Sequence, residues 1–316
     1  MADNEIVNNK ISENELSLLS LVPQVMRARD FRLYTKDGMR LIDLWQNGGA
    51  AVLGHTPAMF LREIKNTAGR GLYAPFPHFT EQRLHKVLSM LFPDRSFRLY
   101  AVPPAEISFP SVYEIAYNNG VSGDNAGRLS PVLWRPFLDF CTQVETQRPE
   151  AAAQNTEAPA AGPAQKPNTP ALVIPVLPGI QGWRGGLPFG LCVYAVLSTC
   201  EEIFSALPPT DFLPPVALAA AARGIWDLIA AAPERGNIQW QHINKVIKNS
   251  PWQRRGIYLF PRLTPGPKAW ELLFRSFLDA GFLLPPLPGH PLILPGILSP
   301  GEEAKLAEIL QTSMSG

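Results

Sequence analysis

The sequence predicts an α/β protein, and three observations lead to this prediction. Segments with the apolar character of strands alternate with segments of helical periodicity along most of the chain. At 316 residues the chain can bury a large core, as one big domain or two modest ones. Hydrophobic residues make up 46% of it, which is ordinary for a globular protein. We therefore expect layers of helices and strands at both ends of the chain.

The N-terminal part of the chain contains a predicted β-hairpin. Asp37 and Gly38 form a turn signal between two apolar runs, which favours a hairpin over residues 31–44. Further on, Thr56 can cap a helix whose first position is Pro57. From the same reasoning we expect a capping-box helix over 11–22, helices over 57–68 and 80–91, and a strand over 97–102.

The middle of the chain is unusually rich in proline. The whole chain has 33 prolines among 316 residues, about twice the usual ~5%. Residues 146–170 consist mainly of Ala, Pro, Gln and Asn, and they cannot bury enough apolar surface to offset their ordering entropy. We predict a disordered linker or loop there. Around it we expect helices over 111–118 and 201–207, an apolar segment of open assignment over 129–141, and strands over 172–177 (broken by Pro175) and 191–197.

An alanine-rich helix is predicted over 215–231, because a proline opens it and Pro233 follows its expected end. Its inward face should contain Leu218, Ala222, Ile225, Trp226 and Ile229. A second amphipathic helix is predicted over 267–280, with Gly281 as its C-terminal cap and Trp270, Leu273, Phe274, Phe277 and Leu278 inward. Other expected elements are a helix over 240–248, strands over 257–260 and 291–294, and a final helix to about 311 that opens with the Ser299–Glu302 capping box.

Charge and cysteine content exclude several classes of function. The net charge of +1 gives no reason to expect nucleic acid or an anionic membrane as a partner. The polar N-terminus lacks the pattern of a signal peptide, and prolines between 280 and 301 exclude a membrane helix there. Cys141, Cys192 and Cys200 show no metal spacing, and the last two lie in apolar text. We expect a soluble, cytoplasmic protein with no nucleic-acid partner and no membrane.

Several motifs occur in an order that resembles a known family. Asp37-Gly38, then Arg40-Leu41-Ile42-Asp43, then a small-residue crossing into Leu53-Gly54-His55-Thr56-Pro57 resembles the entry of class-III pyridoxal-phosphate aminotransferases, especially the glutamate-1-semialdehyde aminomutase branch. Gly185-Gly186-Leu187-Pro188-Phe189-Gly190 is similar to the run after the family's cofactor lysine, and Leu278-Asp279-Ala280-Gly281 to its C-terminal small domain. The resemblance covers about two thirds of the chain.

This resemblance implies a fold and an assembly. The expected fold is that of a fold-type-I pyridoxal-phosphate transferase in degenerate and shortened form. It would have a reduced large domain around a central, mostly parallel sheet, and a small α+β domain built from both chain ends. The implied boundaries are 1–70 for the N-terminal part of the small domain, 71–235 for the large domain, and 236–316 for the C-terminal part of the small domain. The resemblance also implies a homodimer, or a heterodimer with an active relative.

The family's chemistry requires a lysine that forms a Schiff base with the cofactor. The resemblance places Gln181 at the position of this lysine, and a carboxamide cannot form an imine. The nearest lysines in sequence are Lys166, inside the predicted linker, and Lys245, on a later helix. Neither is expected on the loop at the strand end where the family holds its lysine.

Two further requirements are an acid for the pyridine nitrogen and a phosphate cradle at a helix start. Pro175 and Val176 occupy the expected acidic places, and Pro103 and Pro104 remove two N–H donors where the phosphate cradle should be. Thr210 lies where the family has a phosphate-touching threonine from the partner subunit. Its plainer interpretation is a loop threonine beside a helix start.

The remaining polar candidates have mainly structural interpretations. His55 is expected to pack or to stabilise a turn, and Asp43 to make a structural hydrogen bond. The Trp183-Arg184 pair in a Gly-rich loop is either an anchored loop or a ligand-binding tip. The other histidines show no metal spacing: His78, His85, His242 and His290.

The combined loss of lysine, acid and phosphate cradle predicts a non-catalytic, aminotransferase-like protein with a structural or regulatory role. In this interpretation no cofactor is expected. Two alternatives remain open. One is an active pyridoxal-phosphate-dependent aminotransferase or aminomutase with an unconventional lysine such as Lys166. The other is a protein that binds a small molecule in the cleft between the two implied domains and catalyses no reaction.

Overall fold

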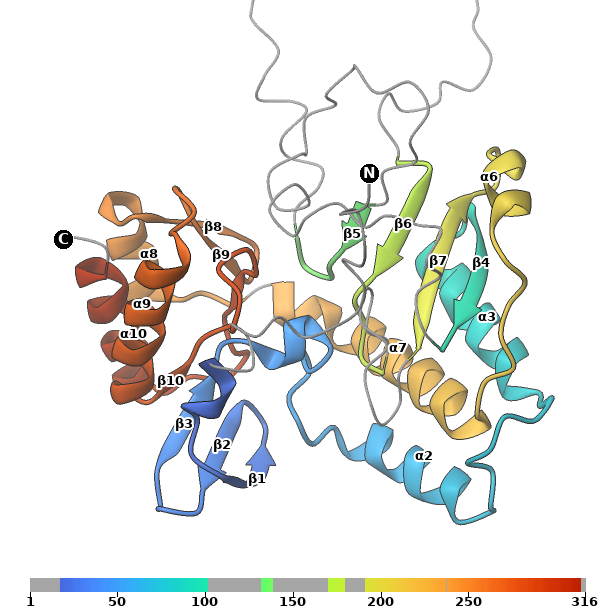
Figure 1. Cartoon of the computed structure of the whole chain (residues 1–316), viewed down its shortest axis with the longest axis horizontal. Helices are drawn as coiled ribbons and strands as arrows, with labels where there is room; N and C mark the ends of the chain where they lie inside the picture. The colour runs from blue at the N-terminus through green and yellow to red at the C-terminus, as the bar shows by residue number, and fades with distance from the viewer. Residues whose placement is uncertain (1–17, 102–131, 139–169, 180–190, 237, 314–316) are drawn as a thin grey trace, which may run out of the picture.

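The computed structural model describes residues 18–101, 132–138, 170–179, 191–236 and 238–313. Two lobes stand side by side (Figure 1). One combines β1–β3 with the C-terminal strands and helices, and the other contains a four-stranded sheet with three long helices. The predicted helix over 111–118, the predicted linker up to residue 169, and the 185–190 motif lie outside the described residues. So does the predicted helix over 11–22, apart from its last residues.

The first lobe joins segments from near both ends of the chain in one sheet. Strands β1 (Val25–Arg29), β2 (Arg32–Thr35) and β3 (Arg40–Asp43) are antiparallel, which confirms the predicted hairpin. Gly38 has φ +85° in its turn, a conformation that glycine adopts without strain. Strand β10 (Phe282–Leu283) then pairs with β3 in parallel. A strand from the last fifth of the chain therefore completes the N-terminal sheet.

A second, three-stranded sheet completes this lobe. Strands β8 (Trp252–Arg255) and β9 (Tyr258–Pro261) form a hairpin, and β11 (Leu292–Ile293) adds to β9. The sequence predicted β9 and β11 but not β8, because Gln253-Arg254-Arg255 is a polar segment. The surrounding helices are α8 (Gln241–Val246), α9 (Pro267–Asp279) and α10 (Pro300–Thr312), with the short 3-10 turn η2 (Ile247–Asn249) after α8. All five residues predicted to face inward on α9 are buried.

The second lobe has a sheet in the order β4-β7-β6-β5. The strands are β4 (Arg95–Tyr100), β5 (Val132–Trp134), β6 (Leu172–Pro175) and β7 (Cys192–Leu197). Strand β7 is antiparallel to both of its neighbours, and only β5 and β6 run parallel. For the described strands, the prediction of a mostly parallel sheet is therefore wrong. Continuous apolar runs are typical of parallel strands, but β7 is buried on both faces while running antiparallel.

Helices α2 (Ala58–Ala68), α3 (Thr80–Leu91) and α7 (Pro215–Gly236) pack together on one side of this sheet, and α6 (Glu201–Ala206) lies at its end (Figure 1). The predicted end of α7 at residue 231 is wrong, because Pro233 lies inside its last turn, where it removes one amide donor without unwinding the helix. Of the residues predicted to face inward on α7, Leu218, Ala222 and Ile225 are buried as expected, whereas Trp226 is 41% exposed.

Helix α2 starts without a side-chain cap. Helix α2 begins at Ala58 with extended Pro57 as its N-cap, and the Thr56 hydroxyl accepts a hydrogen bond from the backbone N–H of Asp30 at 3.3 Å. The prediction that Thr56 caps this helix is therefore wrong.

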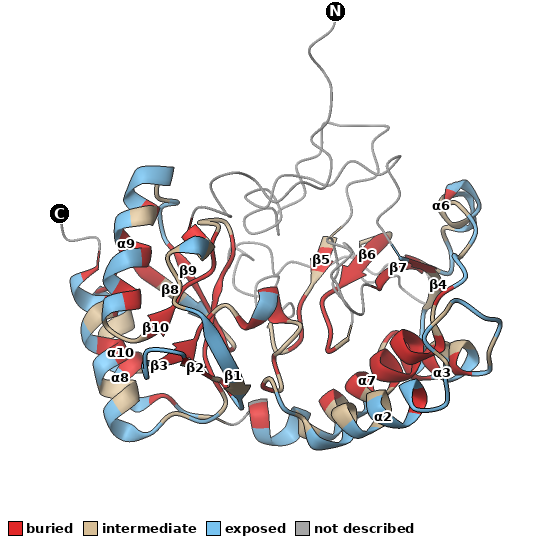
Figure 2. Cartoon of the chain, turned by 60° about the horizontal axis from the view of Figure 1, so that its bottom comes forward, coloured by how far each residue is buried: buried red, intermediate tan, exposed pale blue. Residues whose placement is uncertain are grey.

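Residues Pro215–Arg235 of α7 are long and apolar enough to cross a membrane, but 61% of that apolar window is buried inside the fold. Figure 2 shows this burial on α7, which is typical of a core helix.

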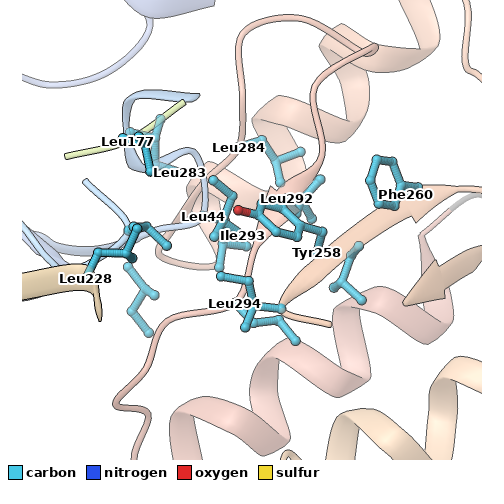
Figure 3. Close-up of a cluster of buried hydrophobic side chains, with 14 of the residues drawn as sticks. Leu44, Leu177, Leu228, Tyr258, Phe260, Leu283, Leu284, Leu292, Ile293 and Leu294 are labelled. Atoms are coloured by element: carbon cyan, nitrogen blue, oxygen red, sulfur yellow. The ribbon is translucent and has the colours of Figure 1, made fainter. Parts of the chain in front are cut away.

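A single buried apolar cluster extends through both lobes. Figure 3 shows its centre, where Leu177 and Leu228 of the second lobe face side chains of the first, such as Leu44, Leu283 and Leu294. A smaller cluster covers the other face of the large sheet, around the ring contact between Tyr100 and Tyr194. The continuous core means that the lobes meet through packed side chains. We call this meeting zone the seam.

Candidate functional site: two buried arginines at the seam

The chain crosses the seam through the short turn η1 (Gln46–Gly49), which has an unusual backbone. Gln46, Asn47, Gly48 and Gly49 all have positive φ, between +48° and +112°. Non-glycine residues rarely adopt this region. A Cβ on Gly49 would lie 3.2 Å from the Val176 side chain and 3.4 Å from Arg135 Nη1. The small-residue crossing in the sequence therefore allows the backbone to approach β6 and an arginine closely.

Asp43 and His55 fix this crossing. Asp43 Oδ1 accepts hydrogen bonds from the backbone N–H groups of Trp45 and Gln46, both at 2.8 Å. Its other oxygen lies 2.8 Å from His55 Nε2. Gln46 in turn donates from its side chain to the Ile293 carbonyl at 3.0 Å. The structural roles predicted for Asp43 and His55 are thus confirmed: the carboxylate holds the turn in place and has no spare oxygen.

Arg135 lies in the interior of the seam. It follows β5 directly and is 5% exposed. Its Nη1 donates to the Gly48 carbonyl, and its guanidinium carbon lies 5.9 Å from the centre of the Tyr258 ring. Burial lowers the pKa of this guanidinium, because a charged group loses solvation in the interior. No carboxylate among the described residues forms an ion pair with it.

Arg235 reaches the same zone from the last turn of α7. It is 8% exposed, donates to the Val52 carbonyl, and lies over the Phe31 ring with its guanidinium carbon 4.9 Å from the ring centre. Burial lowers its pKa to about 10, against an opposing effect of Tyr258. It too has no carboxylate partner among the described residues. The seam therefore holds two buried cations.

Tyr258 lies close to Arg135, whose guanidinium carbon is 5.9 Å from its ring centre, and both arginines affect the pKa of its phenol. Its side chain is fully buried among the apolar residues shown in Figure 3. Its hydroxyl has no hydrogen-bond partner among the described residues. Burial raises the pKa of this phenol, although both arginines oppose the shift. The phenol is thus a neutral donor at physiological pH. Two guanidiniums and one neutral phenol are a set of hydrogen-bond donors suited to an oxyanion.

Some of the site residues predicted from the sequence lie outside the described residues, and others lie at the seam. Gln181, like Pro103, Pro104 and the Trp183-Arg184 pair, lies outside the described residues. Pro175 and Val176 do lie at the seam: Pro175 is paired with Trp134, and the N–H of Val176 donates to the carbonyl of Trp134 at 2.9 Å. Both are buried and neither is acidic. Among the described residues there is no cluster of His, Cys, Asp and Glu that could hold a metal ion.

Thr210 contributes to the edge of the large sheet. Its hydroxyl accepts a hydrogen bond from the backbone N–H of Leu99 at 3.4 Å. Asp211 extends the contact, because its carboxylate accepts from the N–H of Ala101 and its own N–H donates to Leu99, both at 2.9 Å. This placement fits the plainer interpretation, a loop threonine, and whether a partner subunit's cofactor also meets this hydroxyl stays a prediction.

The lysines of the described residues share one property. All seven are exposed: Lys36, Lys65, Lys86, Lys245, Lys248, Lys268 and Lys305. Only Lys10 and Lys166 lie outside the described residues. None of the seven is therefore buried at the seam, unlike Arg135, Arg235 and Tyr258.

Sequence reasoning missed both arginines and the tyrosine. One signal was available for Arg135, which interrupts the apolar run Val132-Leu133-Trp134 before Pro136-Phe137-Leu138. A charge inside an apolar segment is rarely buried without a partner. Arg235 gave no such signal, because it follows Glu234 at an apparently polar helix end. Only the three-dimensional packing brings both arginines to carbonyls of the same crossing, those of Gly48 and Val52.

Comparisons with known proteins give relatives of unknown function and neighbours of known fold. No family model matches the chain. An uncharacterized protein of Treponema pallidum is 28% identical over 294 residues, covering 86% of this chain and 89% of the relative. An uncharacterized protein of Borreliella burgdorferi is 41% identical over 63 residues, covering 20% of this chain and 23% of the relative. These relatives carry no functional assignment.

Solved structures are more informative about the fold. The chain is similar to acetylornithine aminotransferase from Elizabethkingia anophelis, with a TM-score of 0.57, 12% identity, and coverage of 96% of this chain and 99% of that one. For ornithine δ-aminotransferase of Plasmodium falciparum the TM-score is 0.58, at 12% identity and 92% coverage of both chains. An omega-transaminase from Sphaerobacter thermophilus gives 0.54, at 13% identity and 92% and 90% coverage. At these identities the likeness concerns the fold alone: the chain has an aminotransferase-like α/β fold.

Proposed function

We propose that this protein is a non-catalytic relative of class-III aminotransferases, a pseudoenzyme with a structural or regulatory role. The observation that carries the proposal is the position of the lysines. The resemblance puts Gln181 in place of the Schiff-base lysine, and each lysine of the described residues is on the surface. An amine on the surface cannot meet a cofactor held in the seam between two packed lobes.

The described residues of the seam do not fit pyridoxal phosphate as a covalently held cofactor. A Schiff base requires an amine, and the pyridine nitrogen requires an acid that keeps it protonated. The nearby carboxylate, Asp43, is already engaged by two backbone N–H groups and by His55. The guanidiniums of Arg135 and Arg235 are also buried, but they are cations and cannot serve as that acid. We therefore propose that no covalent cofactor is held there.

The proposal is tested by adding the cofactor to the purified full chain. Pyridoxal phosphate is incubated with the protein, the absorbance spectrum is scanned for an internal imine, and borohydride is added before peptide mass mapping. We expect no stoichiometric, site-specific adduct, only scattered labelling of exposed lysines such as Lys65 and Lys268. Free lysine at the same amine concentration gives the spectrum of this non-specific reaction.

A single stoichiometric adduct would overturn the proposal. The lysines to inspect first are Lys10 and Lys166, because they lie outside the described residues. If Lys166 were labelled, the Lys166→Ala variant would lose the adduct, and the active-enzyme alternative would replace ours. Labelling that is spread evenly over exposed lysines supports the pseudoenzyme.

A second candidate function, non-covalent binding of a small molecule at the seam, is favoured by the two arginines without acidic partners. Both candidates are compatible with a dimer and with a cytoplasmic location, which we retain as proposals. Exposed aromatic side chains support the dimer: Tyr73, Phe76, Phe79 and Phe212 are each at least half exposed. Their two segments are adjacent, because the Val216 N–H donates to the Leu72 carbonyl at 3.1 Å. Measuring the molar mass in solution tests this assembly.

A further inference from the structure

We propose that Arg135 and Arg235 form a binding site for one small dianionic oxyanion, such as phosphate or a phosphate monoester group, with the Tyr258 hydroxyl as an additional donor. This goes beyond the pseudoenzyme proposal, because it assigns a ligand class to the seam and requires no chemistry. The site combines three elements that lie far apart in the sequence: the end of β5, the last turn of α7, and β9.

The donors of this site are only partly used. A guanidinium has five N–H donors. The hydrogen bonds of Arg135 and Arg235 to described residues are those to the carbonyls of Gly48 and Val52. The Tyr258 hydroxyl has no partner among the described residues. A neutral carbonyl accepts a hydrogen bond but does not compensate a buried charge, and among the described residues no carboxylate pairs with either guanidinium.

The charge of the seam points to a dianion. Burying an ion without a counterion is strongly unfavourable, and two like charges near one phenol add repulsion. A single ligand of charge minus two would neutralise both guanidiniums at once. The planar fork of arginine matches the oxygens of phosphate and makes paired hydrogen bonds to them. A monocarboxylate would leave one positive charge without compensation.

The backbone around the arginines is built to admit them. A Cβ on Gly49 would be in contact with Arg135 Nη1 at 3.4 Å, and a Cβ on Gly296 would overlap the guanidinium of Arg235. Gly296 therefore leaves room for the guanidinium of Arg235, and Gly49 also has the positive φ that its place in η1 requires. Two buried cations with glycines at their entry are difficult to explain as packing alone.

The site is tested with inorganic phosphate as the probe. The full chain is dialysed into phosphate-free buffer, and its Tm is followed as phosphate is added at constant ionic strength, with chloride and acetate as parallel arms. We expect a saturable rise in Tm of roughly 3 °C or more near 100 times Kd, since a ligand of the folded state stabilises it. Chloride and acetate should give no such rise.

Variants locate the effect. Arg135→Met and Arg235→Met should each abolish the phosphate response. Arg62→Met is the matched control, because Arg62 is exposed on α2, away from the seam, and this variant should keep the full response. Tyr258→Phe removes only the hydroxyl and should raise Kd several-fold, as measured by calorimetry. Inorganic phosphate has no aldehyde, so these results are independent of the imine experiment.

Three outcomes would overturn the site. The first is no rise in Tm beyond that in chloride, which would mean that a carboxylate of the chain itself compensates the arginines. The second is a phosphate response that survives both arginine substitutions. The third is an equal response to acetate, which would contradict the dianion. Should neither arginine variant fold, Tyr258→Phe decides, and an unchanged Kd would reject the assignment.

Discussion

Arg32 belongs to strand β2, and Arg135 directly follows strand β5. Arg32 has a carboxylate partner, whereas Arg135 has none among the described residues. Arg32 on β2 donates from Nε and Nη2 to the two carboxylate oxygens of Glu302, at 3.1 and 2.6 Å. The two side chains are 16% and 11% exposed. Arg135 is more deeply buried and meets a carbonyl and an aromatic ring instead. The hydrogen bond from Arg32 to Glu302 raises the pKa of Arg32, whereas burial lowers that of Arg135.

This contrast shows that the chain does place acids beside half-buried cations. Glu302 receives a second cation, with Arg40 Nη2 at 3.3 Å, and also completes the capping box of α10 with Ser299. Its neighbour Glu303 accepts from the backbone N–H of His242 at 2.6 Å, at the start of α8. In the first lobe, then, acids hold the sheet and helices together. The lack of any such acid beside Arg135 and Arg235, among the described residues, marks the seam as a different kind of site.

Among the substitutions considered for the Arg32–Glu302 pair, Glu302→Gln is expected to have the largest effect on stability. The substitution removes the charge facing Arg32 and Arg40, and we expect a loss of about 1–3 kcal/mol in the free energy of unfolding. Glu271→Gln is the matched control, because its pair with Arg275 on α9 is exposed; it should lose less than about 0.5 kcal/mol. Equal losses in urea unfolding would show that the Arg32 pair has no special weight.

The pH dependence of stability follows from the same carboxylate. Burial acts to raise the pKa of Glu302, but hydrogen bonds from Arg32 and Ser299 and the charge of Arg32 outweigh it and lower the pKa to about 2. A carboxylate whose pKa is depressed by folding stabilises the protein above its unfolded pKa of 4.5 and loses this contribution as pH falls toward 2. We expect about 1–2 kcal/mol to disappear in this window, after allowing for solvent screening. The same slope in Glu302→Gln would contradict the assignment.

A smaller effect is expected at Thr210. Thr210→Val removes the acceptor for the Leu99 N–H and should reduce the free energy of unfolding by about 0.5–1 kcal/mol. It should leave the phosphate response unchanged, because Thr210 lies at the edge of the large sheet and not at the seam. Loss of phosphate binding in this variant would support the role that the family resemblance implies, in which Thr210 contacts a phosphate.

Local signals predicted most of the elements correctly. The Asp37-Gly38 turn, the buried face of α9 and the Ser299–Glu302 capping box depend on residues near each other in sequence, and all three are confirmed. The direction of β7 and the exposure of Trp226 on α7 depend on distant neighbours, and both were predicted wrongly. The seam is the extreme case, since its arginines come from segments a hundred residues apart and meet a tyrosine from a third.

The most direct test is the relative stability of the wild type and Arg135→Met, measured by equilibrium unfolding with and without phosphate. Without phosphate, we predict that the variant is at least as stable, because methionine replaces a buried cation that has no counterion. With saturating phosphate, the order should reverse, because only the wild type gains binding energy. If Arg135→Met is less stable by the same amount in both conditions, Arg135 is already neutralised within the chain, and the seam is not an anion site.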